Sequence, residues 1–482
     1  MRTYKKITLL YLLLIITVLP LFTKDGFYKL GEAKGMLFLM LGGVFFAACV
    51  ITMLRFKLRL NIGVFGALLF SGVTTFIFSV DKKTAFLGLD GWRMGFLSFL
   101  FIIFFACVLS DGIEVKRAYA TVLLIPFAIS ILAILGRFGI YPLGVSASDG
   151  SFLSTIGNIN WFTAYLSIFV PFGVGIAATK KRFSLEFFIC ETYVIAGTVA
   201  LLVQGSESGL LIIAGTYLLL LFMGLSDREL FKAFLIQLFT LGIAMASVYL
   251  LIFFFGKRYT YEDNLLIRLC MHHIGIVLMA LALFVYRLTR FMEEVSYQWK
   301  KNLYKKFFFV LTIIGAVAAA IFIFGIYGDD FGNGRGIIWR MSLDMYAGLD
   351  PFRKIVGVGQ DCFYSYAYGN PFWSESFINV FDGNRLTNAH NMYLTLLIEN
   401  GAIGLLSYLF VFGHVLFKLI KAEDKKKHAA VICALPIFAY LINGLVSFST
   451  VVSTPYAFLL LGYSLYITKE ESSDITQDQA RE

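Results

Sequence analysis

The chain has 482 residues, of which 59% are hydrophobic and only 15% are charged, a balance that excludes an ordinary soluble protein of this length. Its net charge of +10 would favour nucleic-acid binding in a soluble protein, but here the basic residues lie between long apolar runs. We interpret them as signals of membrane topology, and we expect membrane lipid rather than nucleic acid as a partner. The six cysteines show neither a disulfide framework nor a metal-binding spacing, so the sequence predicts no metal and no cofactor.

About fourteen apolar runs have the length that spans a lipid bilayer, roughly 17–25 residues each. They predict an all-α integral membrane protein. The first run resembles a signal peptide, but no small-residue cleavage site follows it at 21–24, so we expect a retained helix. In chain order the runs are 7–22, 36–54, 61–79, 95–110, 118–136, 161–179, 186–203, 209–225, 232–255, 265–286, 307–327, 392–417, 429–448 and 452–468.

Lysine and arginine alternate in density along the chain, and the densest segment between two runs extends from Arg287 to Lys306. By the positive-inside rule this pattern predicts that both termini lie inside. The predicted organisation has four parts, which are a transmembrane core at 1–327, an external catalytic loop at 328–391, C-terminal transmembrane helices at 392–468 and a polar cytoplasmic tail at 469–482.

The external loop is the one long polar interval between apolar runs, and loops of that length in a compact protein are usually functional. Ile337, Ile338, Met341, Met345 and Leu349 follow helical spacing, which predicts a short amphipathic helix along the membrane surface. The loop is also rich in aromatic residues. These side chains pack either on the outer membrane interface or against sugars, and the sequence leaves both interpretations open.

Two residues of this loop are the strongest candidates for chemistry. Arg335 lies in a glycine cluster before the predicted helix, where backbone N–H groups and a guanidinium suit a phosphate. His390 directly precedes a helix and is suited to accept a proton near neutral pH. Arg340 either contacts substrate or pairs with Asp344 four residues on. The adjacent acids Asp329 and Asp330 lack further ligands for a metal.

Four further residues are candidates for substrate binding. Asn391 follows His390 directly, and Asn160 either caps the sixth apolar run together with Asn158 or donates to a sugar hydroxyl. Arg93 is either an interfacial arginine beside the membrane or a contact for a lipid phosphate. Arg268 lies within an apolar run, where an ionisable residue suggests function, although it is near enough to the outer surface to snorkel.

Several motifs fall in order along the second half of the chain, namely Arg335-x-x-x-Trp339, Pro351, Gly357-x-Gly359 and His390-Asn391-x-Tyr393-Leu394, followed by Glu399, Gly401 and Gly404. Together they resemble the signature of the O-antigen ligase and O-antigen polymerase superfamily. Members are multi-pass bacterial glycosyltransferases with a large external loop near the C-terminus. The run Gly157-Asn158-x-Asn160 also resembles theirs, so the resemblance covers most of the chain.

The resemblance implies a GT-C-like membrane enzyme in the bacterial cytoplasmic membrane, with its active site on the outer face. It implies a donor glycan on undecaprenyl diphosphate, a glycan or lipid acceptor, and no required metal. His390 would match the family's loop histidine and Arg335 its loop arginine. Many members carry Ser-Arg-Gly at the end of a middle helix, whereas this chain has Ser206-Glu207-Ser208-Gly209. Arg93 or Arg268 would then supply the missing charge.

Several functions remain open on the sequence alone. A polymerase and a ligase of envelope polysaccharide differ only in their acceptor, which no motif identifies, and we favour the polymerase. The alternative from another class is a flippase or other transporter of lipid-linked oligosaccharides, in which broken helices and a charged central cavity are typical. A non-catalytic scaffold that binds other polysaccharide-assembly proteins would not need His390.

Overall fold

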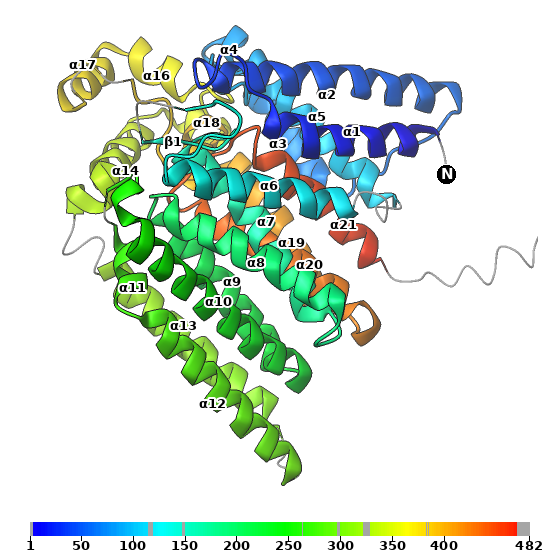
Figure 1. Ribbon diagram of the computed structural model, residues 1–482. Helices are drawn as coiled ribbons and strands as arrows, with labels where there is room; N and C mark the ends of the chain where they lie inside the picture. Colours follow the sequence, from blue (N-terminus) through cyan, green and yellow to red (C-terminus); the bar gives the residue numbers. More distant parts are fainter. Residues whose placement is uncertain are drawn as a thin grey trace, which may run out of the picture.

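The computed structural model describes residues 3–113, 119–146, 150–262, 264–295, 299–321, 328–381, 383 and 385–469, and these are mostly helical, with one short antiparallel pair of strands, β1 (Phe152–Leu153) and β2 (Gly157–Asn158) (Figure 1). The predicted all-α class is therefore confirmed. The cytoplasmic tail predicted at 469–482 lies outside the described residues from position 470 on. The helices are α1 (Thr3–Leu21), α2 (Leu30–Arg55), α3 (Phe65–Ile77), α4 (Lys82–Leu87), α5 (Phe96–Ser110), α6 (Tyr119–Arg137), α7 (Ile159–Thr179), α8 (Leu185–Val203), α9 (Ser208–Gly224), α10 (Arg228–Phe255), α11 (Leu265–Met271), α12 (Ile274–Glu294), α13 (Lys301–Ile321), α14 (Phe331–Ala347), α15 (Pro351–Val356), α16 (Phe363–Gly369), α17 (Pro371–Val380), α18 (Met392–Glu399), α19 (Gly401–Ile420), α20 (Lys427–Asn443) and α21 (Thr454–Ile467).

Seven helices in the described ranges are long and apolar enough to cross a membrane, namely α1, α2, α7, α8, α10, α12 and α19. Five shorter apolar helices, α3, α5, α6, α9 and α21, coincide with further predicted runs. The chain thus has the composition and helix lengths of a membrane protein. The number of fourteen crossings stays a prediction, and the run at 307–327 extends beyond the described part of α13.

Two predicted runs are interrupted in the structure. The run at 265–286 divides into α11 and α12 at His273, whose φ is +59° and whose ring lies 4.6 Å from that of Tyr249. The run at 392–417 divides into α18 and α19 at Gly401, whose φ is +67°. A side chain at Gly401 would collide with the carbonyl oxygen of Ile355, so the helix breaks where the backbone of the external loop docks against it.

Close backbone contacts hold the helix bundle together at its centre. The helix α7 packs between α8 and α20, and a Cβ at Gly175 would lie 2.8 Å from the Cα of Ile432 on α20. A Cβ at Gly462 on α21 would collide with the carbonyl oxygen of Ala106 on α5. Small residues at such crossings let apolar helices approach closely, as is typical of helices that pack in a membrane.

Buried charges inside the bundle have structural partners. The ammonium of Lys34 on α2 donates to the carbonyl oxygens of Leu19, Pro20 and Phe22 at 2.8, 3.0 and 2.8 Å, which satisfies the C-terminal end of α1. The carboxylate of Glu191 on α8 accepts hydrogen bonds from side chains of α10. These charges therefore contribute to helix packing.

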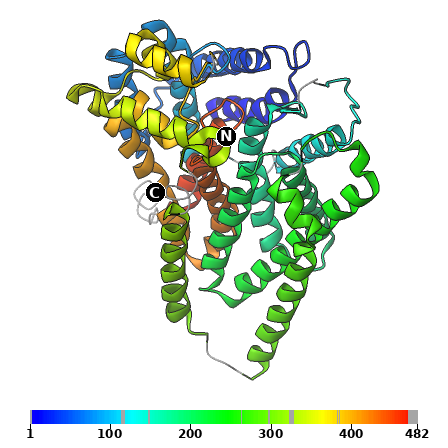
Figure 2. The ribbon, with the colours of Figure 1, turned by 90° about the vertical axis from the view of Figure 1, so that its left-hand side faces the viewer.

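The external loop is folded onto one end of the bundle (Figure 1). Its helices α16 and α17 lie near α4, and Figure 2 shows the same yellow helices beside the blue N-terminal ones. The backbone N–H of Val80 donates to the carbonyl oxygen of Val358 at 2.8 Å. The predicted amphipathic helix is confirmed as α14, but it begins at Phe331, so the glycine cluster forms its first turns rather than a preceding loop.

The aromatic residues of the loop mostly pack against one another. A second hydrophobic core contains Trp339, Met345, Phe363 and Phe377, which are buried. Phe372, in contrast, is exposed. Most of these rings therefore form the loop's own core, which neither of the two sequence interpretations predicted.

The glycine motifs of the loop form the junction between the loop and the α18–α19 break. The N–H of Gly359 donates to the carbonyl oxygen of Glu399 at 2.9 Å, and that of Val358 to Ile398 at 3.0 Å. The φ angles of Gly357 and Gly359 are +84° and +128°, and a side chain at Gly357 would collide with Glu399. These motif residues therefore hold the loop in place.

The predicted topology can be tested by labelling cysteines in intact cells. Cys362 is fully buried and is unsuitable as a probe, so we choose Glu375→Cys on exposed α17 and Asp424→Cys between α19 and α20. We expect a membrane-impermeant maleimide to label position 375 in intact cells and position 424 only after the membrane is opened. The native chain, whose six cysteines are all buried, is the control. The reverse pattern of labelling would overturn the topology.

Candidate functional site

A cavity of about 780 Å³ opens at the end of the bundle that carries the external loop. All of its lining residues come from helix ends and connecting segments that the topology predicts to be outside. They are Phe27, Lys29, Leu30, Gly31, Glu32, Asp90, Gly91, Trp92, Phe152, Gly157, Asn158, Asn160, Trp161, Arg385, Thr387, His390 and Phe448. We call this cavity the His390 pocket. It unites segments that are far apart in the sequence.

His390 is held rigidly at the wall of this pocket. Its φ is +47°, its backbone N–H donates to the side-chain oxygen of Asn388 at 2.9 Å, and its ring lies 5.3 Å from that of Phe448 in an edge-on arrangement. Burial, and after it the positive charge of Arg335, lower the pKa of the imidazole to about 4. The imidazole is therefore neutral at physiological pH and has a lone pair to accept a proton.

Asn391 has a capping role next to His390. Its side-chain oxygen accepts hydrogen bonds from the backbone N–H groups of Tyr393 and Leu394 at 3.0 and 3.1 Å, so it is the N-cap of α18. Asn391 does not line the His390 pocket. Asn391, predicted to bind substrate, therefore caps the start of α18, which directly follows His390.

Arg335 on α14 does not itself line the His390 pocket but contacts Asn160, which does, and its guanidinium is incompletely satisfied. One terminal nitrogen donates to the carbonyl oxygen of Gly332 at 3.0 Å and the other to the side-chain oxygen of Asn160 at 3.4 Å. The Nε is buried and has no hydrogen-bond partner. Burial lowers the pKa of Arg335, opposed by the charge of Glu207. A buried donor without an acceptor is costly, and an anion would satisfy it.

Asn160 connects Arg335 to the turn between α8 and α9. Its side-chain oxygen also accepts from the hydroxyl of Ser206 at 3.4 Å, and that hydroxyl shares a 2.6 Å hydrogen bond with Ser208. The predicted capping role is confirmed for Asn158, whose side chain accepts from the N–H of Asn160 at 2.8 Å. Arg335 therefore brings a positive charge to the very turn that lacks the arginine of the resembled family.

Arg93 is bound by two carboxylates, an arrangement that differs from both sequence interpretations. Its guanidinium lies 2.5 Å from Glu32 and 2.7 Å from Asp90, and both acids line the His390 pocket. The charge of Arg93 is thus compensated in this structure. The ion pairs join the start of α2 to the segment that carries Trp92, and so they shape one wall of the pocket.

Arg340 and Arg268, like Arg93 and Arg335, do not line the pocket. Arg340 lies 2.7 Å from the carboxylate of Asp329, so the predicted pairing with Asp344 is wrong. The ion pair forms because the 3-10 turn at 328–330 folds back along α14. Arg268 is exposed on α11, which ends before His272.

An aromatic wall of the pocket was missed by the sequence analysis. The rings of Trp92 and Trp161 are 5.3 Å apart, and Trp92 and Phe448 are 4.9 Å apart, both edge to face. Trp161 and Phe448 lie at ends of apolar runs, where aromatic residues are common at a membrane interface, so they carried no separate signal. Together with His390 these rings form an apolar surface beside polar groups, which is typical of small-ligand sites.

The described residues contain no group of three or more histidine, cysteine or carboxylate side chains that could hold a metal ion. Comparison of the chain with protein-family models and with curated proteins finds no match.

Proposed function

We propose that this protein is a metal-independent membrane glycosyltransferase that moves a glycan from undecaprenyl diphosphate to an acceptor hydroxyl. The reaction would occur on the outer face of the bacterial cytoplasmic membrane, in polysaccharide biosynthesis, and we favour polymerisation. The observation that supports the proposal is that Arg335, whose guanidinium is incompletely satisfied, donates to Asn160 and lowers the pKa of His390, while Asn160 and His390 both line the pocket. A proton acceptor beside an anion-binding donor is what transfer from a diphosphate requires.

In this reaction the acceptor oxygen attacks the anomeric carbon of the donor sugar. The bond from that carbon to the diphosphate oxygen breaks, and its electron pair leaves with the diphosphate. The acceptor's proton passes to His390, while Arg335 stabilises the charge that develops on the leaving group. A diphosphate beside Arg335 also offsets the positive charge that lowers the pKa of His390, so donor binding makes the imidazole a better base.

The same pocket has surfaces for the glycan. Trp92, Trp161 and Phe448 offer apolar ring faces, and Glu32 and Asp90 offer carboxylate oxygens that accept hydrogen bonds from hydroxyl groups. Such a combination of apolar walls and a few oriented polar groups is typical of pockets that bind sugars and other small ligands.

A transporter of lipid-linked oligosaccharides is the second candidate, because the helix breaks at His273 and Gly401 are of a kind that transporters use. The Gly401 break, however, is filled by the backbone of the external loop. Purified protein with a lipid-diphosphate glycan separates the two functions. A glycosyltransferase makes longer or transferred glycan and releases undecaprenyl diphosphate, whereas a flippase leaves the glycan–diphosphate bond intact.

We expect chelators to leave the transfer rate unchanged, because Arg335 supplies the positive charge that stabilises the leaving diphosphate. A divalent metal would otherwise have that role. The measurement is the initial rate with and without excess EDTA, with a known metal-dependent glycosyltransferase as the control. Loss of activity in EDTA and recovery with Mg²⁺ or Mn²⁺ would place the chemistry at Asp329 and Asp330 instead.

A further inference from the structure

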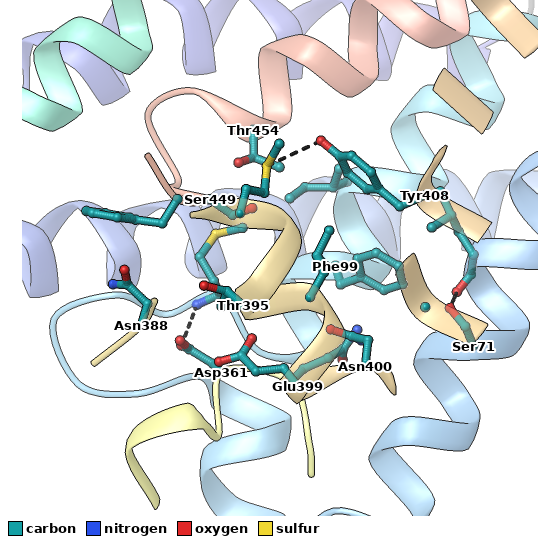
Figure 3. A pocket seen from close by; sticks show the side chains of 18 of the residues that line it. Ser71, Phe99, Asp361, Asn388, Thr395, Glu399, Asn400, Tyr408, Ser449 and Thr454 are labelled. Carbon is teal, nitrogen blue, oxygen red and sulfur yellow. Dashed lines mark hydrogen bonds between the residues drawn. The ribbon is translucent and has the colours of Figure 1, made fainter. Parts of the chain in front are cut away.

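A small second chamber of about 80 Å³ adjoins the His390 pocket, and Trp92 and Phe448 line both. Its walls include two acids, Asp361 and Glu399 (Figure 3). Asp361 directly precedes the segment that leads into α16, and Glu399 is the last residue of α18, just before the Gly401 break. Neither acid has a role in the proposed transfer reaction.

The carboxylate of Asp361 binds both ends of the segment that carries Trp92. One of its oxygens accepts from the backbone N–H groups of Leu89 and Met94 at 2.7 and 3.1 Å. The carboxyl group of Glu399 accepts from the N–H of Phe363 at 3.2 Å and from that of Asp361. The two acids thus join the Trp92 segment, the external loop and α18 at one place.

Two carboxyl groups and one unpaired amide oxygen line the chamber. Figure 3 shows the side chains of Asp361 and Glu399 directed toward one another at one end of the chamber. Gln360 also lines it, is 4% exposed, and has a side-chain oxygen without a hydrogen-bond partner. In the described part of the chain neither acid lies within ion-pair distance of a cation. Two adjacent buried carboxylates repel one another unless one of them carries a proton.

We propose that Asp361 and Glu399 share one bound proton, carried mainly by Glu399, and that this acid pair positions Trp92 in the His390 pocket. The inference about Trp92 rests on the proposed function, whereas the bound proton does not. As a protonated acid, Glu399 donates to the carboxylate of Asp361, which keeps its two backbone N–H donors. Loss of the proton would set two negative charges against each other and loosen the Trp92 segment.

Burial and the surrounding charges favour Glu399 over Asp361 as the group that carries the proton. Burial raises the pKa of Glu399 well above its usual range, and the charge of Asp361 raises it further. The pKa of Asp361 is raised to about 6, because burial outweighs the lowering by its backbone donors and by Arg93. The other titratable groups nearby are Cys362, Asp81 beyond it, and Tyr408 on α19, and none of these is a cation.

The first test is infrared spectroscopy of the purified protein at neutral pH. We expect a carboxylic-acid carbonyl band that shifts in D₂O and is absent in Glu399→Gln. Glu375→Gln, which removes an exposed acid on α17, is the matched control and should keep the band. The wild-type spectrum needs no variant to fold. If the band is missing in the wild type, or unchanged in Glu399→Gln, the bound proton is refuted.

The second test is the pH dependence of stability, measured as Tm in detergent between about pH 5 and pH 9. Because the folded-state pKa of Glu399 is raised, its stabilising contribution is complete at low pH and is lost as the pH rises through that pKa. We expect Tm of the wild type to fall with rising pH more steeply than Tm of Glu399→Gln. Parallel curves for the two proteins would contradict the proposal.

The third test, the pH dependence of kcat and of tryptophan fluorescence, examines the positioning of Trp92 independently of the bound proton. We expect kcat of the wild type to fall at alkaline pH together with a change in tryptophan fluorescence, and both changes to be absent in Glu399→Gln. Trp92→Phe should remove the fluorescence change and serves as its control. If the infrared and Tm results hold but no transfer occurs in any variant, the glycosyltransferase proposal fails while the bound proton stands. Identical alkaline loss of kcat in the wild type and Glu399→Gln would refute the positioning role.

Discussion

Replacing His390 by alanine is expected to lower the rate of glycan transfer by about 10²–10⁴-fold, which is the usual contribution of a general base. His390 lies outside the candidate membrane spans, so protein level and membrane insertion should stay near normal. The pocket holds a neutral imidazole whose pKa is lowered to about 4, and no other histidine lines it.

The φ of +47° at His390 calls for a second variant, because alanine is strained in that conformation. Asparagine adopts positive φ readily and cannot take up the proton, so His390→Asn should be as inactive as His390→Ala but more stable. His414→Ala, on α19 away from the pocket, is the control histidine and should retain activity. The kcat/KM of the wild type, which reports the pKa of His390 in the free enzyme, should fall only as the pH approaches about 4. Full-length polymer at normal levels from His390→Asn would make His390 structural.

Replacing Arg335 by alanine is expected to lower the transfer rate by about 10²–10³-fold, because a charge contact to the transition state is lost. Arg335→Lys should recover only part of the rate, since lysine keeps the charge but loses the planar fork of donors. Arg335→Ala should also change the dependence of the transfer rate on pH. Removing the positive charge that lowers the pKa of His390 shifts the acidic limb of the profile to higher pH.

Arg340→Ala is the matched control for Arg335, since both residues lie on α14. Arg340 is largely exposed and pairs with Asp329, and exposed ion pairs typically contribute about 0–1 kcal/mol. Its loss should leave the transfer rate near that of the wild type. Equal losses of rate in Arg335→Ala and Arg340→Ala would show that the charge of α14 as a whole matters, and it would remove the specific role of Arg335.

Much of the fold was predictable because run length and apolar composition determine where membrane helices form. The interruptions at His273 and Gly401 were not, because they depend on contacts between distant segments. Gly401 reads as one more small residue in an apolar run, and only the docking of Ile355 explains its positive φ. The core of the external loop was missed for the same reason, since spacing alone did not show that Phe363 and Phe377 pack together.

The site was predictable in part. His390, Arg335 and Asn160 were candidates by residue type, local glycine content and helix starts, and in the structure Asn160 and His390 line one pocket while Arg335 contacts Asn160. The pairing of Arg93 with Glu32 joins residues 61 positions apart, which no local pattern reveals. The two acids of the second chamber could not be predicted as a pair from the sequence. Glu399 stood out only as part of the motif that follows His390. No pattern in the sequence indicates that Asp361 accepts hydrogen bonds from Leu89 and Met94, which are distant in the chain.

The most direct test of the central proposal is the initial rate of undecaprenyl diphosphate release by purified protein supplied with a lipid-diphosphate glycan and an acceptor. The wild type should release the lipid diphosphate in step with the formation of longer or transferred glycan, and His390→Asn should release it at least about 10²-fold more slowly. Equal rates in the two proteins, or translocation of the glycan with its diphosphate bond intact, would contradict a glycosyltransferase site at His390.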